Sequence, residues 1–352
     1  MKKIDVAILG ATGAVGQRFI QLLEGHPWFR VAEVVGKASA GKPYGEAVHW
    51  VLDSEPPSSV AEMVVKPLES DLSSPIVFSA LPKEAAQERE MPLAAAGHVV
   101  CTNASTYRME DDVPLLLPEV NVGHVSLIAH QRKLRGWSTG ALVANSNCTV
   151  MPVVMSLAPL KPFGIEQVVM VSQQAVSGAG YPGVASLDIL DNVVPYIGGE
   201  EEKLEIELAK MLGTLEGERI VYHGARSSAT CTRVPVTDAH LVSLSVALRE
   251  KLSLEDIIKA WETYQPDESL ADLPSAPQPA LHYLRQPDRP QPRRDRNAGN
   301  GMATSIGRLR ECPILGYKFV TLSHNTIRGA AGCSILNAEL LVKRGYVHGV
   351  QA

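Results

Sequence analysis

The chain has 352 residues, of which 45% are hydrophobic, a length that fits about two domains with buried cores. The formal net charge of -5 gives no basic surface for nucleic acid. No apolar run approaches the ~20 residues of a membrane-spanning helix, so neither nucleic acid nor a membrane is an expected partner. The five cysteines lack the spacing of a zinc site or a disulfide framework, which indicates a reducing, cytoplasmic compartment and no metal.

Predicted strands and helices alternate in the first part of the chain. Ile4–Leu9 is an apolar run that ends in Gly10, and Ala14–Leu23 follows with helical spacing of its apolar residues. The alternation predicts a parallel, doubly wound sheet. The remaining elements predicted there are strands at Phe29–Val35, 63–67, 76–81 and 98–102 and an alanine-rich helix at 83–97.

After Cys148 the predicted strands become longer and occur in runs. This pattern indicates an α+β domain with a mixed or antiparallel sheet. The proline- and arginine-rich residues 266–296 are predicted to form a surface loop, with a subunit-contact arm as the alternative. The predicted strands are 167–173, 225–233, 241–248 and 317–322, and the predicted helices are 201–212, 254–264 and 325–343.

A glycine-rich turn, Gly10-Ala11-Thr12-Gly13-Ala14-Val15-Gly16, joins the first strand to the first helix. Glycines let the backbone approach a pyrophosphate closely, so the turn predicts dinucleotide binding; the alternative is a tight turn without a ligand. The acid that would bind a ribose hydroxyl is absent after the second strand, because Glu33 lies inside it. Lys37 and Ser39 instead favour the 2′-phosphate of NADP over NAD, although Lys37 also fits a solvated loop.

The polar residues Asn145, Ser146 and Asn147 lead through Cys148 into an apolar segment that is predicted to be a helix. The positive end of a helix favours a thiolate, the reactive form of cysteine. Cys148 is therefore a candidate nucleophile, and the alternative is a small residue that happens to begin a helix.

Other residues could complete a site around this thiol. Arg233 and His240 are separated by Pro235, so both could face one cleft, and a histidine can pass the proton that a thiol loses. Arg108 follows the carboxyl end of a strand, where open α/β sheets bind ligands, and suits a phosphate or carboxylate. Taken alone, a residue such as His240 is more often an ordinary polar residue, and one such as Arg233 is most often a surface charge. The turn that contains Gln174, Ser177 and Gly178 could approach a flat ring.

Seven segments occur in the order found in aspartate-semialdehyde dehydrogenases, and the chain resembles that family to about residue 345. The segments are GATGAVGQ, NASTYRM, SNCT, QQAVSGAG, EEEK, CTRVPVTDAH and SHNTIRGAAG. Residues 298–311, AGNGMATSIGRLRE, are similar to the archaeal and fungal branch, which also includes malonyl-CoA reductase. The resemblance implies a Rossmann-type NADP-binding domain of residues 1–147, completed by residues 325–352, and a catalytic and dimerisation domain of residues 148–324.

The resemblance also implies a reaction. NADP would serve the interconversion of L-aspartyl-4-phosphate and L-aspartate 4-semialdehyde plus phosphate through a thioester on Cys148, in lysine, threonine and methionine biosynthesis. The implied catalytic residues are Cys148, His240 and Gln174. The implied substrate residues are Arg233 for the carboxylate, Glu201 or Glu202 for the amino group, and Arg108, Asn147 and Lys203 for phosphate. The candidates for the cofactor site are Gly10, Thr12, Gly13, Ala14, Val15, Lys37, Ser39, Ser79, Ser177, Gly178 and Asn325.

Three other functions remain open at the level of sequence. Malonyl-CoA reductase would use the same cysteine but would not need an acid for an amino group or a phosphate pocket. N-acetyl-glutamyl-phosphate reductase matches the chain less well, and a non-catalytic NADP sensor would not be expected to keep both Cys148 and His240. A homodimer and a homotetramer are both compatible with the resemblance.

Overall fold

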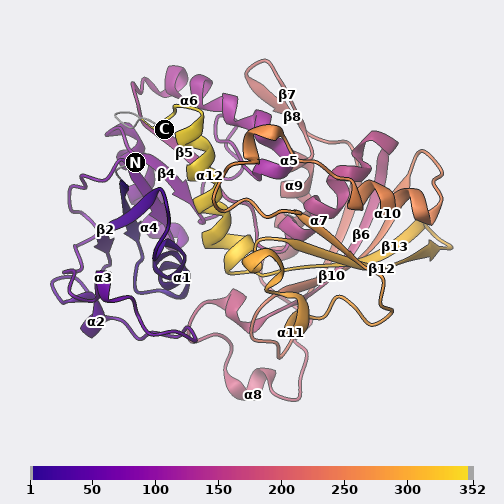
Figure 1. Cartoon of the computed structure of the whole chain (residues 1–352), viewed down its shortest axis with the longest axis horizontal. Helices are drawn as coiled ribbons and strands as arrows, with labels where there is room; N and C mark the ends of the chain where they lie inside the picture. The colour runs from indigo at the N-terminus through magenta and orange to yellow at the C-terminus, as the bar shows by residue number, and fades with distance from the viewer. Residues whose placement is uncertain (1–2, 348–352) are drawn as a thin grey trace.

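The computed structural model describes residues 3–347 and consists of two sheets with their covering helices, one toward each end of the molecule (Figure 1). The first sheet has five parallel strands in the order β2-β1-β3-β4-β5. Its strands are β1 (Ile4–Leu9), β2 (Phe29–Val35), β3 (Ile76–Ser79), β4 (Val99–Thr102) and β5 (Ala141–Ala144). Every residue of β3, β4 and β5 is buried, as expected for a parallel sheet covered on both faces.

The helices of this domain connect its parallel strands. They are α1 (Ala14–Leu23), α4 (Lys83–Ala95), α6 (Leu127–Arg135) and the short α2 (Tyr44–Ala47), α3 (Ser58–Ala61) and α5 (Pro118–Asn121). The chain runs outward from β1 in both directions, to β2 on one side and to β3 on the other. Ligands of such sheets bind at the carboxyl ends of the strands beside this point, where the glycine-rich turn lies.

The second sheet is mixed, with six strands in the order β11-β12-β13-β10-β6-β9. The β11–β12 and β6–β9 pairs are parallel, and the other pairs are antiparallel. Its strands are β6 (Ile165–Gln174), β9 (Arg226–Arg233), β10 (His240–Leu248), β11 (Leu281–Leu284), β12 (Thr304–Cys312) and β13 (Gly316–Ser323). The helices α7 (Val150–Leu157), α9 (Glu200–Met211) and α10 (Leu254–Glu262) contact this sheet, and Val169 and Val171 of β6 are exposed. The mixed sheet agrees with the sequence prediction.

Several smaller elements lie outside the two sheets. A two-stranded hairpin is formed by β7 (Thr214–Glu216) and β8 (Arg219–Val221), and the short helices α8 (Ser186–Ile189) and α11 (Pro292–Asp295) lie in loops. The α8 loop extends away from the rest of the molecule in Figure 1. Within residues 3–347, no helix is both long and apolar enough to cross a membrane.

The C-terminal helix α12 (Gly332–Lys343) contacts β3, β4 and α1 of the first domain. It begins later than the sequence predicted, because residues Ile327–Ala331 form a π-helix that precedes it. Arg328 in this π-helix is fully buried and forms a 2.7 Å ion pair with Glu119 of α5. The predicted helix 325–343 therefore begins with a differently wound segment that lies beside Cys148. The end of the implied domain segment, residues 348–352, lies outside the described residues.

The structure contradicts two of the secondary-structure predictions made from the sequence. Residues 63–67 do not form a strand, because only the isolated bridges Pro43–Val64 and Val35–Lys66 occur there. The segment 266–296 is not simply a surface loop, because β11 within it pairs with β12 as the edge strand of the second sheet. Backbone pairing with a neighbouring strand supplies the order that the proline-rich sequence does not indicate.

Candidate active site

Cys148 lies between β5 and α7, where the two domains meet. The side-chain oxygen of Asn147 accepts hydrogen bonds from the N–H groups of Thr149, at 2.7 Å, and Val150, at 3.3 Å. These contacts satisfy N–H groups that the first turn of a helix leaves free. Asn147 therefore fixes the start of α7 and, with it, the position of Cys148, whose side chain is half-buried.

The thiol contacts an imidazole that comes from a distant part of the chain. Cys148 Sγ lies 3.2 Å from Nε2 of His240, the first residue of β10. The Ala175 N–H donates to His240 Nδ1 at 3.1 Å, so in the neutral ring the proton is on Nε2 and points to sulfur. Burial and, after it, the Arg233 charge lower the pKa of His240 to about 3. The ring is therefore neutral, and it can take the thiol proton at Nε2 only by giving up the Ala175 hydrogen bond.

The helix start was expected to favour a thiolate at Cys148, and the surroundings of the thiol act in the opposite direction. Burial and the Glu200 carboxylate raise the pKa of the Cys148 thiol to about 12, although the Arg108 and Arg233 charges oppose them. A helix start favours the thiolate by a modest amount, which loss of water and a neighbouring anion exceed here. A cation that neutralises Glu200 would lower the pKa of the Cys148 thiol, and a substrate ammonium group is one such cation.

One face of α9 supplies charged groups to the cysteine. Glu200, Lys203 and Glu207 are three and four residues apart, so they lie on one side of the helix. Glu200 accepts a 2.8 Å hydrogen bond from Asn147 Nδ2, and Glu207 accepts a 2.6 Å hydrogen bond from the Asn147 N–H. The cysteine loop is thus held by α9 through both carboxylates.

Arg108 lies in the same group of charges. Its Nη1 donates to Glu207 at 2.9 Å and its Nη2 donates to the Asn103 carbonyl at 2.8 Å. Its Nε is buried with no hydrogen-bond partner, which is unusual for a charged donor. Such a donor suits an anion bound beside Cys148.

Gln174 and Arg233 end two neighbouring strands, β6 and β9, and pair with each other in the sheet register. Arg233 Nη1 donates to the Ala175 carbonyl at 2.8 Å, and Gln174 is buried, with its amide donating to Ser172 at 3.2 Å. A Cβ on Gly178 would lie 2.8 Å from Arg233 Nη1 and 3.0 Å from a carbon of the His240 ring. Only glycine allows the turn after β6 to lie this close to both side chains.

The three acids that open α9 differ in their surroundings. Glu202 is exposed, and the Glu201 carboxylate accepts a 2.9 Å hydrogen bond from the Cys231 N–H of β9. Glu200 is the acid that faces Cys148, whereas the family resemblance implied Glu201 or Glu202 for the substrate amino group. Helical phase could have found it, since Glu200 and the implied phosphate residue Lys203 are three residues apart and share a face.

The glycine-rich turn has the geometry that close approach requires. A Cβ on Gly16 would lie 2.2 Å from the Gly10 carbonyl oxygen, and Gly10 itself has a φ of +71°. Gly13 precedes the first residue of α1 and is exposed, whereas Ala14 and Val15 are half-buried. The Gly13 N–H donates to the Gly10 carbonyl, so the N–H groups left for an anion are those at the start of α1.

The loop after β2 lies beside this turn. A Cβ on Gly36 would lie 2.5 Å from Ser39 Oγ and 3.8 Å from Thr12 Oγ1, and Lys37 is exposed. Glu33 is bound to Lys66 at 2.7 Å and to the Ser74 N–H at 2.8 Å. The Glu33 carboxylate is engaged in these contacts inside the domain and cannot bind a ribose.

Ser79 ends β3 and is buried. Between the domains lies a cavity of about 340 Å³ that Ala14 lines from one side and Ser177 from the other. Asn325 is bound to Ala239 and Ser177 rather than left free to face this cavity.

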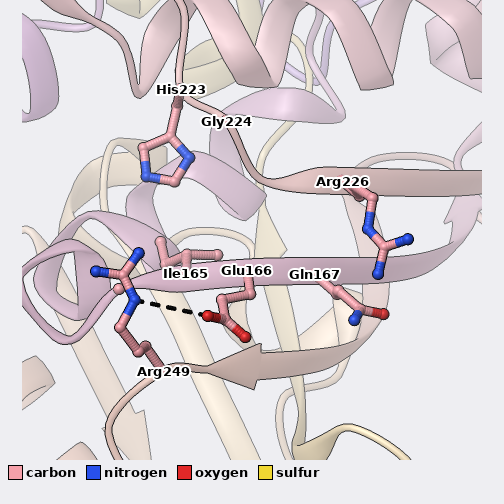
Figure 2. A pocket seen from close by; sticks show the side chains of 8 residues that line it. Ile165, Glu166, Gln167, His223, Gly224, Arg226 and Arg249 are labelled. Carbon is pink, nitrogen blue, oxygen red and sulfur yellow. Dashed lines mark ion pairs between the residues drawn. The ribbon is translucent and has the colours of Figure 1, made fainter.

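A larger hollow of about 480 Å³ lies at the opposite end of β6 and contains none of the residues predicted for the site. Figure 2 shows His223, Arg226 and Arg249 around it, with Arg249 Nε 3.6 Å from Glu166. Cys148 and His240 are at the other end of this domain, so the hollow is separate from the candidate active site.

A nucleotide-binding sheet joined to a domain that brings a cysteine against a histidine is the arrangement of a thiol-dependent dehydrogenase. Family models agree with this class. Residues 5–128 match the semialdehyde dehydrogenase NAD binding domain, and residues 157–328 match the semialdehyde dehydrogenase dimerisation domain. The chain therefore belongs to the semialdehyde dehydrogenase family.

Relatives cover nearly the whole chain. An aspartate-semialdehyde dehydrogenase of Archaeoglobus fulgidus is 47% identical over 343 residues, which are 97% of this chain and 98% of the relative. One of Aspergillus fumigatus is 46% identical over 358 residues, covering 98% of this chain and 99% of the relative. A crystal structure of the Candida albicans aspartate semialdehyde dehydrogenase with NADP matches with a TM-score of 0.90 at 39% identity, covering 98% of this chain and 100% of that one. These sources are archaeal and fungal, as the resemblance of residues 298–311 implied.

Proposed function

We propose that the chain is an NADP-dependent aspartate-semialdehyde dehydrogenase, which interconverts L-aspartate 4-semialdehyde plus phosphate and L-aspartyl-4-phosphate for lysine, threonine and methionine biosynthesis. The observation that carries the proposal is the 3.2 Å contact of Cys148 Sγ with His240 Nε2, with Arg108 and Arg233 near the thiol. A thiol beside an imidazole suits covalent attack on an aldehyde. The two guanidinium groups suit the anions of this substrate pair.

The substrate roles follow from the charges around the sulfur. Arg233 binds the substrate carboxylate, and the unpartnered Nε of Arg108, together with Lys203, binds phosphate. Glu200 binds the substrate ammonium group, because it faces Cys148 whereas Glu201 and Glu202 do not. The malonyl group of malonyl-CoA carries no ammonium group, so Glu200 and the names of the relatives both favour the aspartate enzyme over malonyl-CoA reductase.

The chemistry can then be written with its atoms balanced. Cys148 Sγ bonds to the aldehyde carbon, and the thiol proton passes to the carbonyl oxygen, which becomes the hydroxyl of a thiohemiacetal. With NADP bound, one hydride from that carbon would go to the cofactor, and the hydroxyl proton would go to His240 Nε2 once the ring proton lies on Nδ1. A thioester on Cys148 would remain, oriented by Gln174. A phosphate oxygen then attacks the thioester carbon, and Cys148 leaves as a thiolate that accepts the Nε2–H of His240.

The cofactor proposal rests on the glycine-rich turn and its neighbours. The close approach of Gly10 to Gly16 fits a pyrophosphate, and Lys37 and Ser39 beside Thr12 fit the 2′-phosphate of NADP. We expect the double substitution of Lys37 and Ser39 by alanine to raise the KM for NADP and to leave the KM for NAD unchanged. An equal rise for both cofactors would contradict this assignment.

The assembly and compartment are also proposals. The match to a dimerisation domain and the exposed Val169 and Val171 on the second sheet support a homodimer formed through this sheet. The five free cysteines support a reducing, cytoplasmic compartment. Sedimentation of the purified chain would test the dimer directly.

The test of function is a phosphate-dependence assay. Purified protein should reduce NADP with aspartate semialdehyde only when phosphate or arsenate is present. Cys148→Ser should abolish turnover and keep NADP binding, while Cys312→Ser serves as the matched thiol control and should retain turnover. Activity with malonyl-CoA alone, or NADP binding without turnover of either substrate, would reject the proposal.

A further inference from the structure

His240 follows a residue with an unusual backbone. Ala239 has a φ of +85°, in the left-handed region that residues with a side chain rarely adopt, and it is completely buried. The peptide unit before His240 therefore carries strain that the surrounding structure must hold in place. Any relaxation of Ala239 would turn the backbone on which the His240 ring is mounted.

The amide of Asn325 holds this backbone. Asn325 Oδ1 accepts the Ala239 N–H at 2.7 Å, and Asn325 Nδ2 donates to Ser177 Oγ at 2.8 Å. The sheet register explains how they meet, because His240 pairs with Ser323, so the chain that continues past β13 runs beside the residues that precede β10. Asn325 is itself buried, so its amide is held in one orientation.

We propose that Asn325 is a positioning residue, which holds Ala239 in its left-handed conformation and thereby holds His240 Nε2 against Cys148 Sγ. This role differs from the place in the cofactor site that was expected for Asn325. The prediction for kcat rests on the proposed function. The alkylation rate of Cys148 reports the geometry of the Cys148–His240 pair and needs no substrate.

A second hydrogen bond holds the His240 ring, and it differs in its role from the Asn325 contact. The Ala175 N–H holds Nδ1 at 3.1 Å and so selects the tautomer, but it does not fix the backbone at Ala239. Loss of the Asn325 contact would leave a ring of the correct tautomer that is displaced from the sulfur. The thiolate would then lose its hydrogen-bond donor.

The decisive experiment combines Asn325→Ala with Ala239→Gly. We expect Asn325→Ala to lower kcat by about 10- to 100-fold, because a displacement of about 1 Å costs this much at a reacting centre. It should also slow alkylation of Cys148 by iodoacetamide at a fixed pH, with the NADP dissociation constant unchanged. Glycine adopts a positive φ without strain, so residue 239 no longer needs the Asn325 contact in the double variant. The kcat and the alkylation rate of the double variant should therefore be close to those of Ala239→Gly alone.

Two results would overturn the proposal. A weaker NADP dissociation constant with unchanged kcat and alkylation would assign Asn325 to the cofactor instead. A double variant no faster than Asn325→Ala, with both variants folded by circular dichroism, would show that Ala239 strain is not involved. If the wild-type protein does not oxidise aspartate semialdehyde, the proposed function fails, but the alkylation rates still decide whether Asn325 positions His240.

Discussion

A Cβ atom on Gly329 would lie 2.6 Å from the Cβ of Cys148, so the π-helix before α12 is in direct contact with the reactive residue. Real Cβ atoms do not approach one another this closely, and Cys148 would have to move. We expect Gly329→Ala to lower turnover by about 100-fold, because the sulfur leaves its place beside His240. Steady-state kinetics with aspartate semialdehyde would measure the loss, with NADP binding as the test of folding.

Gly123→Ala is the matched control for this substitution. A Cβ at Gly123 would meet nothing within 4 Å, so turnover should stay near that of the wild type. Wild-type turnover of the Gly329→Ala protein would show that the sulfur tolerates displacement and would contradict the prediction.

Glu200→Gln should make the Cys148 thiol more reactive toward an alkylating agent and should weaken the binding of aspartate semialdehyde. Glu200 helps to raise the pKa of Cys148, so its neutralisation should speed the alkylation of Cys148 at a fixed pH. The same change should raise the KM for aspartate semialdehyde, because the substrate ammonium group loses its partner. Glu202→Gln, on the exposed side of the same helix turn, should alter neither quantity, and a slower alkylation of the Glu200→Gln protein would refute the assignment.

Glu90 should make the stability of the protein depend on pH. Burial raises the pKa of this carboxyl to about 7, and Thr102 Oγ1 donates to it at 2.6 Å. The folded-state pKa lies above the unfolded one, so the stability that the neutral acid contributes is complete below pH 4.5 and is lost as pH rises through about 7. Over this window the loss is up to about 3 kcal/mol.

Glu90→Gln should therefore raise the melting temperature at pH 8 and have little effect at pH 5. Thermal unfolding followed by circular dichroism at both pH values would measure the difference. Glu88→Gln, an exposed acid on the same helix, is the control that reports any general effect of removing a negative charge. A Glu90→Gln effect of equal size at both pH values would argue against the raised pKa.

The buried ion pair of Arg328 and Glu119 should show strong coupling in a double-mutant cycle. Both side chains are almost completely removed from water, and Arg328 also contacts Met155 through Nη2 at 3.4 Å. Glu119→Gln leaves the Arg328 charge buried without a counterion, which should cost about 3–5 kcal/mol of unfolding free energy. Adding Arg328→Met should recover much of this lost unfolding free energy, as measured by urea denaturation. If the losses of the two single variants simply add in the double variant, the prediction is contradicted.

The positions of the reactive groups were only partly predictable. The strand–turn–helix pattern around Gly10 and the polar residues before Cys148 are local, so the candidate nucleotide site and the proposed nucleophile could be predicted from neighbouring residues alone. Helical phase groups Glu200 with Lys203 on one face of α9, since successive helical residues point about 100° apart, but only the docking of α9 shows that this face lies toward the sulfur.

By itself, then, the sequence determined the two-domain α/β architecture, the family and the candidate cysteine and histidine, since periodicity and short motifs depend on residues close in the chain. The tertiary structure alone decided the burial and neighbouring charges that raise the pKa of that cysteine, the strand within residues 266–296 and the bond of Asn325 to Ala239. Each of these depends on groups brought together from distant segments. Loss of water, neighbouring charge and strand pairing are properties of such contacts, and no stretch of residues specifies them in isolation.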